Sequence, residues 1–174
     1  MSFYDHFSEE EVAILRARAA RIARTQNEVK PGEILTALVI HAGGETYALP
    51  IEALVAVYVE HTIIQVPCVP PYVAGVANIR GQILTVLDLA VLLKVSSGTT
   101  PHALVVASDG EFSVAFCAEA VGETITLPNS DLQPVPAALN GDYLQAVVPG
   151  GIALLNLKAL FDDEALTVDE TVGQ

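Results

Sequence analysis

PPYVAGVANIRGQILTVLDLAVLL, residues 70–93, is the stretch of sequence that decides the fold. It is the longest apolar run of the chain, and one Arg80-Gly81 turn interrupts it. The segments 73–79 and 82–87 on either side of the turn are rich in valine and isoleucine, which predicts two strands joined as a hairpin. A guanidinium between two buried strands needs an acceptor, a partner surface or open water, and the hairpin alone leaves these alternatives open for Arg80.

Strand-like alternation of apolar residues continues on both sides of this hairpin. We expect further strands over residues 34–40, 45–51, 54–59, 63–66, 102–108, 111–116, 120–127, 143–148 and 152–155. Glycine-containing turns join several of these strands, of which Asp109-Gly110 is the strongest hairpin signal. A polar, proline-marked loop over 128–139 and a closing helix over 157–166 complete the pattern.

The two parts of the chain resemble each other at a nearly constant offset. Matching segments are 44–45 and 110–111, 51–54 and 118–121, and 84–92 and 152–160, separated by 66, 67 and 68 positions. A steady offset indicates an internal repeat. Each unit then has about five short strands, enough to close a small barrel without exposed sheet edges. We therefore expect a first barrel over 33–95 and a second barrel with the closing helix over 101–166.

The repeat places Asp88 and Asn156 at equivalent corners of the two units. Each precedes a short leucine-rich segment, and both residue types favour the first position of a helix. We expect each side chain to cap a short helical turn. A catalytic role for Asp88 is the alternative, and it has less support from the sequence.

Residues 1–30 predict a helical extension in front of the barrels. Ser8 and Glu11 are spaced as a capping box, with hydrophobic residues on either side. The helix has one narrow apolar stripe, made of Val12, Leu15, Ala19 and Ile22. Such a stripe suits a helix that docks on the body of the protein or one that binds a partner. Residues 167–174 are expected to form a frayed tail.

The net charge of −13 excludes some function classes, since it is concentrated in the body of the chain. Residues 1–30 carry five acids and five bases, whereas the remainder carries 16 acids against Arg80, Lys94 and Lys158. Such a surface repels nucleic-acid backbones and anionic lipid. No apolar run approaches the roughly 20 residues of a spanning helix, and the acidic N-terminus does not resemble a signal peptide. We expect a cytoplasmic protein.

The sequence shows no cluster of reactive side chains. Cys117 is expected in the core and Cys68 at a partly exposed position, without the spacing of a zinc site. No metal or catalytic-triad spacing links the four histidines, which are His6, His41, His61 and His102. Phosphate-cradling loops and nucleophile motifs are not found, and the carboxylates are scattered. These features predict an interaction module that is not an enzyme and has no metal or cofactor.

Three segments together resemble the CheW family of bacterial chemotaxis adaptors. They are GGETYALPIEALVAV (43–57), GVANIRGQILTVLDL (75–89) and IALLNLKALF (152–161), and the resemblance covers about residues 33–161. It implies an all-β fold of two SH3-like five-stranded barrels, here with an N-terminal amphipathic helix and a short C-terminal helix. Family members are not catalytic. They connect the cytoplasmic tips of chemoreceptors to the regulatory domain of a CheA-type histidine kinase, at membrane-associated receptor clusters.

The resemblance also implies a partner-binding site. The receptor tip is expected in a groove near Leu54, Gly75, Asn78 and Arg80, with Gly81 completing the turn, and the kinase is expected on exposed apolar strands and turns. The family often has Glu-Ile in the third strand, where this chain has Ala56-Val57. Arg80 therefore lacks that acceptor. Glu60 or another acid can replace this missing acceptor, or Arg80 is free to bind a partner.

Two alternative functions remain open from the sequence. One is a sensory domain that binds a small molecule between the barrels, although few polar residues are available to line such a pocket. The other keeps the family but places the adaptor in a pilus-motility or other chemosensory-like system.

Overall fold

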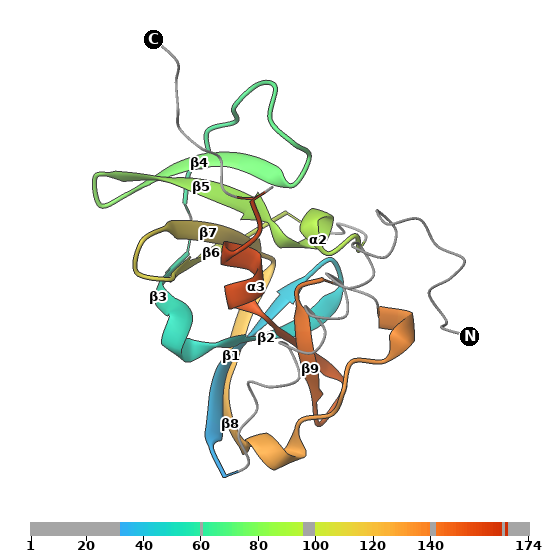
Figure 1. The fold of residues 1–174 in the computed structure, drawn as a ribbon. Coiled ribbons are helices and arrows are strands. Elements are labelled where there is room, and N and C mark those ends of the chain that lie inside the picture. The colour runs from blue at the N-terminus through green and yellow to red at the C-terminus, as the bar shows by residue number, and fades with distance from the viewer. Residues whose placement is uncertain (1–31, 60, 96–99, 140–141, 165, 167–174) are drawn as a thin grey trace, which may run out of the picture.

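Two five-stranded sheets make up most of the protein in the computed structural model (Figure 1). The structure describes residues 32–59, 61–95, 100–139, 142–164 and 166. The predicted extension 1–30 and the tail 167–174 lie outside the described residues. The predicted all-β fold of two five-stranded, SH3-like barrels with a short C-terminal helix is confirmed.

Each sheet has a hairpin at or near its centre and further strands on both sides of it. The first sheet has the order β8-β1-β2-β10-β9. Its strands are β1 (Ile34–Ala42), β2 (Glu45–Pro50), β8 (Ala120–Pro128), β9 (Leu144–Val148) and β10 (Ile152–Leu155). The second sheet has the order β3-β6-β7-β5-β4. Its strands are β3 (Leu54–Val59), β4 (Val73–Ile79), β5 (Gln82–Asp88), β6 (Ala103–Ser108) and β7 (Ser113–Ala118).

The two sheets have the same arrangement of equivalent strands. Strands β1 to β5 of the first half are equivalent to β6 to β10 of the second half, and exchanging each strand for its equivalent turns the order of one sheet into that of the other. The internal repeat is therefore present in the topology. Each half, however, contributes strands to both sheets, so the predicted division into barrels at 33–95 and 101–166 is wrong.

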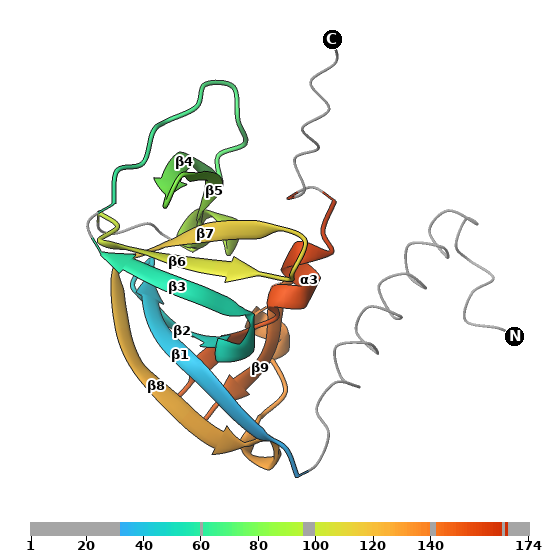
Figure 2. The same ribbon diagram turned by 90° about the vertical axis from the view of Figure 1, so that its left-hand side faces the viewer.

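The exchange occurs where the chain leaves the central hairpins. After β2, a single 3-10 turn, η1 (Ile51–Ala53), redirects the chain so that β3 pairs with β6 of the other half. The equivalent step after β7 brings β8 against β1. Figure 2 shows both crossings, with β3 beside β6 and β8 beside β1. Parallel pairing of β2 with β10 and of β5 with β7 completes the two sheets.

The main apolar core lies between the sheets and belongs to both. Its fully buried members include Ile40 and Leu49 from the first sheet and Val105 and Phe116 from the second. Two smaller clusters lie within the individual sheets, around Val86 in the second and Leu154 in the first. The shared core means that the two barrels pack as one unit.

One short helix follows the last strand of each half. The two helices are α2 (Leu89–Leu92) and α3 (Leu157–Phe161). The predicted caps are confirmed: Asp88 accepts the Val91 amide hydrogen at 3.1 Å, and Asn156 accepts that of Ala159 at 3.0 Å. With its carboxylate used as a cap, Asp88 has a structural role.

The predicted closing helix over 157–166 is too long. Helix α3 ends at Phe161, and Asp162 and Asp163 follow directly. Carboxylates are unfavourable at the negative end of a helix, which accounts for the early end. The predicted strand over 63–66 is also wrong, because Ile64 makes only an isolated bridge there. Three prolines follow within seven residues and cannot donate hydrogen bonds to extend a ladder.

The two cysteines lie in the environments that the sequence predicts. Cys117 on β7 is buried and Cys68 is exposed. Burial raises the pKa of the Cys117 thiol to about 12, and the nearby charge of Asp88 adds to the effect. The neutral thiol is therefore the stable form of Cys117 in the folded protein.

We expect one thiol of the native protein to react with a disulfide reagent at pH 8, and both to react in urea. A Cys68→Ser variant serves as the control and should leave the native protein unreactive. The raised pKa of Cys117 stabilises the fold below pH 9, the ordinary thiol value, and this contribution is lost as the pH rises from about 9 towards 12. Equal labelling rates of Cys68 and Cys117 in the native state would contradict the burial of Cys117.

Candidate partner-binding surface

The turn between β4 and β5 has a backbone shape that few residues adopt. Arg80 has φ +53° and Gly81 has φ +88°. Two central residues with positive φ are typical of a type I′ hairpin turn, whose twist matches that of the strands. The Asn78 side-chain oxygen accepts the Gly81 amide hydrogen at 2.8 Å and holds the turn closed. The turn therefore presents the Arg80 side chain from a fixed, exposed position.

The Arg80 guanidinium lies over an aromatic ring of β3. Its Cζ atom is 5.9 Å from the centroid of the Tyr58 ring, within the range of a cation–π contact. The His61 ring lies on the same tyrosine, with ring centroids 5.0 Å apart. Tyr58 is thus a partner of Arg80 that the sequence analysis missed. The proposed substitute, Glu60, lies outside the described residues.

This contact joins the two ends of the second sheet. Strands β3 and β4 are the outermost strands of the order β3-β6-β7-β5-β4. Arg80 follows β4 and Tyr58 belongs to β3, so the sheet curls until its two edges approach each other. Tyr58 and Ile63 both pack against the cluster inside this sheet. The curvature is that of a barrel, and Arg80 lies at its seam.

Gly75 and Leu54 have different environments from the turn residues. Gly75 is buried with φ +146°, and a Cβ atom there would lie 2.2 Å from the Ile64 carbonyl oxygen. Ile64 and Val76 exchange two backbone hydrogen bonds, each of 2.8 Å. The missing side chain of Gly75 therefore lets the loop lie against β4. Leu54 is half-buried and packs against the main core.

Of the five predicted site residues, the structure brings three together. Asn78, Arg80 and Gly81 share the exposed turn, whereas Gly75 and Leu54 support the strands behind it. The sequence pattern did not separate these roles, because the packing of Gly75 depends on a residue 11 positions away.

The outward face of β3 is apolar over its whole length. Val55, Val57 and Val59 are 64%, 40% and 68% exposed, and they alternate with partly buried residues. The repeat places Gly122, Thr124 and Thr126 at the equivalent exposed positions of β8. Since the same fold accepts polar residues there, the valines are not required for folding. An exposed apolar face of this kind is typical of an interaction site.

Sequence reasoning could have found this face. A half-buried strand usually alternates apolar and polar residues, whereas LVAVYV (54–59) is apolar throughout. The loop that follows β3 adds three more exposed apolar side chains, which are Ile64, Val66 and Val69.

The described residues contain no group of three or more His, Cys, Asp or Glu side chains that could hold a metal ion. Their helices are also too short or too polar to cross a bilayer.

Comparison with known proteins identifies a family. The family model described as "CheW-like domain" matches residues 36–165, which is about three quarters of the chain. Among curated relatives, the probable chemotaxis protein CheW of Rhizobium etli is 31% identical over 106 residues, covering 56% of this chain and 68% of the relative. The chemotaxis protein CheW of Bacillus subtilis is 25% identical over 146 residues, covering 79% and 92%.

Other matches are shorter or concern the fold alone. The chemotaxis protein CheW of Rhizobium meliloti is 31% identical over 90 residues, and the match spans 51% of this chain and 57% of that protein. The crystal structure of scaffolding protein TtCheW from Thermoanaerobacter tengcongensis superposes with a TM-score of 0.68 at 19% identity. The superposed region covers 76% of this chain and 96% of the TtCheW chain.

The geometry predicts unequal effects of alanine at the two glycines of the hairpin. In Gly81→Ala the added Cβ atom has no neighbour within 4 Å. The free energy of unfolding should therefore fall only by the strain of a positive φ, about 1–2 kcal/mol. Gly75→Ala has the same kind of strain and also displaces the Ile64 carbonyl, so it should cost about 2–5 kcal/mol. Urea denaturation of both variants measures the difference. Equal losses would show that the loop does not pack on Gly75 as described.

Proposed function

The chain belongs to the CheW-like family of chemotaxis scaffold adaptors, and from this premise we propose that it couples chemoreceptors to a CheA-type histidine kinase without catalysing a reaction. The observation that carries the proposal is the exposed apolar face of β3 beside the Arg80 turn. These elements lie on one barrel and come from strands whose positions the shared core fixes.

The chemistry of this surface suits a protein partner. Interfaces are enriched in aromatic residues and arginine at their centre, and their central contacts exclude water. Here Val55, Val57 and Val59 offer apolar area on a rigid strand, at a low cost in side-chain entropy. Arg80 supplies a planar group with several donors on a body that is otherwise strongly acidic. A carboxylate of the partner is the natural acceptor for it.

Within this proposal the five predicted residues have two roles. The exposed side chains of Asn78 and Arg80 contact the receptor tip or the kinase directly, and Gly81 sets the shape of the turn. Leu54 and Gly75 hold the strands and the loop in place behind the contact surface. The proposed location is the cytoplasmic side of receptor clusters. Whether the pathway drives flagella, pili or another output depends on the cognate receptor and kinase.

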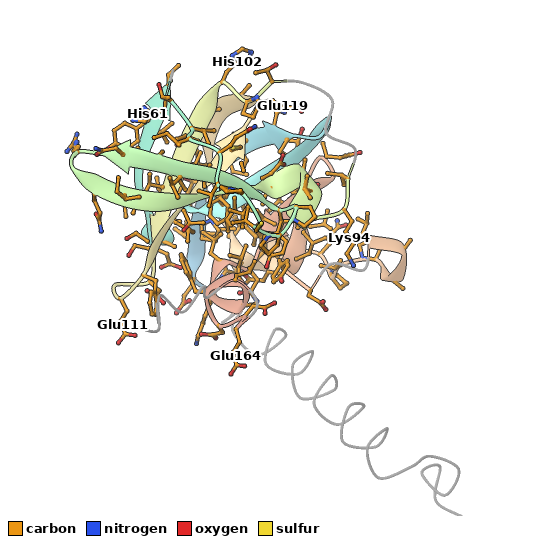
Figure 3. All side chains as sticks on the ribbon, turned by 90° about the horizontal axis from the view of Figure 1, so that it is seen from above. His61, Lys94, His102, Glu111, Glu119 and Glu164 are labelled. Carbon is orange, nitrogen blue, oxygen red and sulfur yellow. The ribbon has the colours of Figure 1, made fainter. Side chains whose placement is uncertain are left out.

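Reversal of the charge at Arg80 tests the proposal most directly. Arg80→Glu should weaken co-purification with the receptor tip or the kinase by at least about tenfold, since an acid then faces the acidic partner group. Lys94→Glu is a matched control, because Lys94 is also exposed with a positive φ, of +59°. Figure 3 shows Lys94 on the far side of the molecule from His61, which lies on the Tyr58 ring. Equal binding of both variants to both partners would count against Arg80 as a contact.

The apolar strand can be tested without changing its shape. Replacing Val55, Val57 and Val59 together by threonine introduces the residue type that the equivalent strand β8 already carries at two of the three positions. We expect little change in the urea midpoint but a clear loss of partner binding by pull-down or calorimetry. Ile34→Thr, at an exposed position of the other sheet, is the control. Retained binding by the triple variant would refute the β3 face as the docking surface.

A further inference from the structure

A small apolar hollow lies on a different part of the surface, between α3 and the turn that joins β6 to β7. Its volume is about 100 Å³, roughly the share of three water molecules in the liquid. Its apolar lining is Leu87, Phe112, Val114, Leu160, Phe161 and Leu166. Phe112 is 53% exposed at the rim, so a large apolar surface there faces water.

Acidic residues adjoin the lining residues of this hollow in the sequence, both on the β6–β7 turn and after α3. Asp109 and Glu111 lie on the β6–β7 turn, and Asp162, Asp163 and Glu164 follow α3. Figure 3 shows the side chains of Glu111 and Glu164 on the same side of the molecule, pointing away from the body. Hydrogen bonds from the Phe112 and Glu111 amides lower the pKa of Asp109, so it stays ionised. The hollow is thus an apolar floor between two acidic borders.

The repeat shows that the fold does not require these residues. The strand registers make Thr46 equivalent to Ser113, so Phe112 belongs to the β6–β7 turn, and the shorter β1–β2 turn, Gly43-Gly44, has no aromatic residue. Asp162-Asp163 corresponds to Lys94-Val95, so the acids after α3 have no counterpart after α2. Acids at this end of a helix also do not stabilise it. The exposed phenylalanine and the acidic borders are therefore specific features of the second half.

We propose that the hollow is the docking site for the protein's own N-terminal segment, residues 8–24. The segment has the complementary chemistry. Its predicted apolar stripe is Val12, Leu15, Ala19 and Ile22. At 100° per residue, Arg16 and Arg18 fall on opposite sides of this stripe. A helix lying with its stripe on the hollow places one arginine towards each acidic border. This contact is separate from the β3 face and does not depend on the adaptor role.

The connection between segment and body is short enough to keep the segment near the body. Seven residues, 25–31, separate the segment from the described chain at Gly32, and they span up to about 25 Å when extended. Figure 2 shows the start of β1 at the lower end of the body and helix α3 above it, about halfway up. The charges agree as well, because residues 1–30 hold five of the eight basic residues while the body holds 16 of the 21 acids.

Hydrogen exchange of the full chain, measured by mass spectrometry, tests the docking. Ala19→Asp adds a charge within the stripe, whereas Ala17→Asp adds the same charge on the opposite helix face, so their intrinsic helix costs match. We expect amides 8–24 to exchange at least about tenfold faster in Ala19→Asp than in wild type, and within about twofold of wild type in Ala17→Asp. Peptides covering 109–114 and 157–166 should lose protection in the same variant only.

Two further measurements identify the occupant. A Glu111→Arg/Glu164→Arg variant and high salt should each reduce the protection of residues 8–24, because both remove the charge attraction. The protection should not depend on protein concentration, whereas docking by a second copy would increase with it. Unchanged protection of strands β1 and β2 shows that each variant is folded. Equal exchange in the two aspartate variants, or an unaffected α3 region, would overturn the proposal.

Discussion

The exchange of strands between the two halves is the constraint on which the rest of the structure depends. Each half places its hairpin in one sheet and its remaining three strands in the other, so neither sheet can form from one half alone. The apolar cluster between the sheets then contains residues of both halves, with Phe116 and Leu49 among its fully buried members. Folding must bring distant strands together, as in the pairing of β1 with β8, before that surface is removed from water. The exchange also fixes the barrels relative to each other, and a surface beside their junction is therefore rigid.

Rigidity explains why a single turn residue can matter for binding. Arg80 lies at the seam where the second sheet curls, over the ring of Tyr58. A guanidinium over an aromatic ring keeps its in-plane N–H donors available, whereas a buried ion pair with a carboxylate would use them. In the role proposed above these donors would be available to a partner, because neither Ala56 nor Val57 offers Arg80 a carboxylate. Within the described part of the chain, Arg80 thus has a defined position over the Tyr58 ring.

Local features of the structure could be predicted from the sequence and long-range ones could not. The Arg80-Gly81 turn, the bounds of β4 and the caps at Asp88 and Asn156 depend on residues within a few positions of each other, and all were predicted correctly. The strand exchange was missed because periodicity shows that a strand exists but does not show its neighbour. The role of Gly75 was missed for the same reason, since only the fold brings the Ile64 carbonyl against it. The contact of Arg80 with Tyr58 also joins segments 22 residues apart.

The duplication separates what the fold needs from what its surfaces do. Some positions that both halves fill with similar residues serve the fold, as Asp88 and Asn156 do at the helix caps. Two positions that differ between the halves are exposed: Val57 faces water where β8 has Thr124, and Phe112 lies in the β6–β7 turn, whose counterpart Gly43-Gly44 has no aromatic residue. An apolar side chain in water gains nothing for folding over a polar one at the same position, so the difference needs another cause. The β3 face and the rim of the hollow lie at such positions, and contact with another surface, as proposed for each, would account for both.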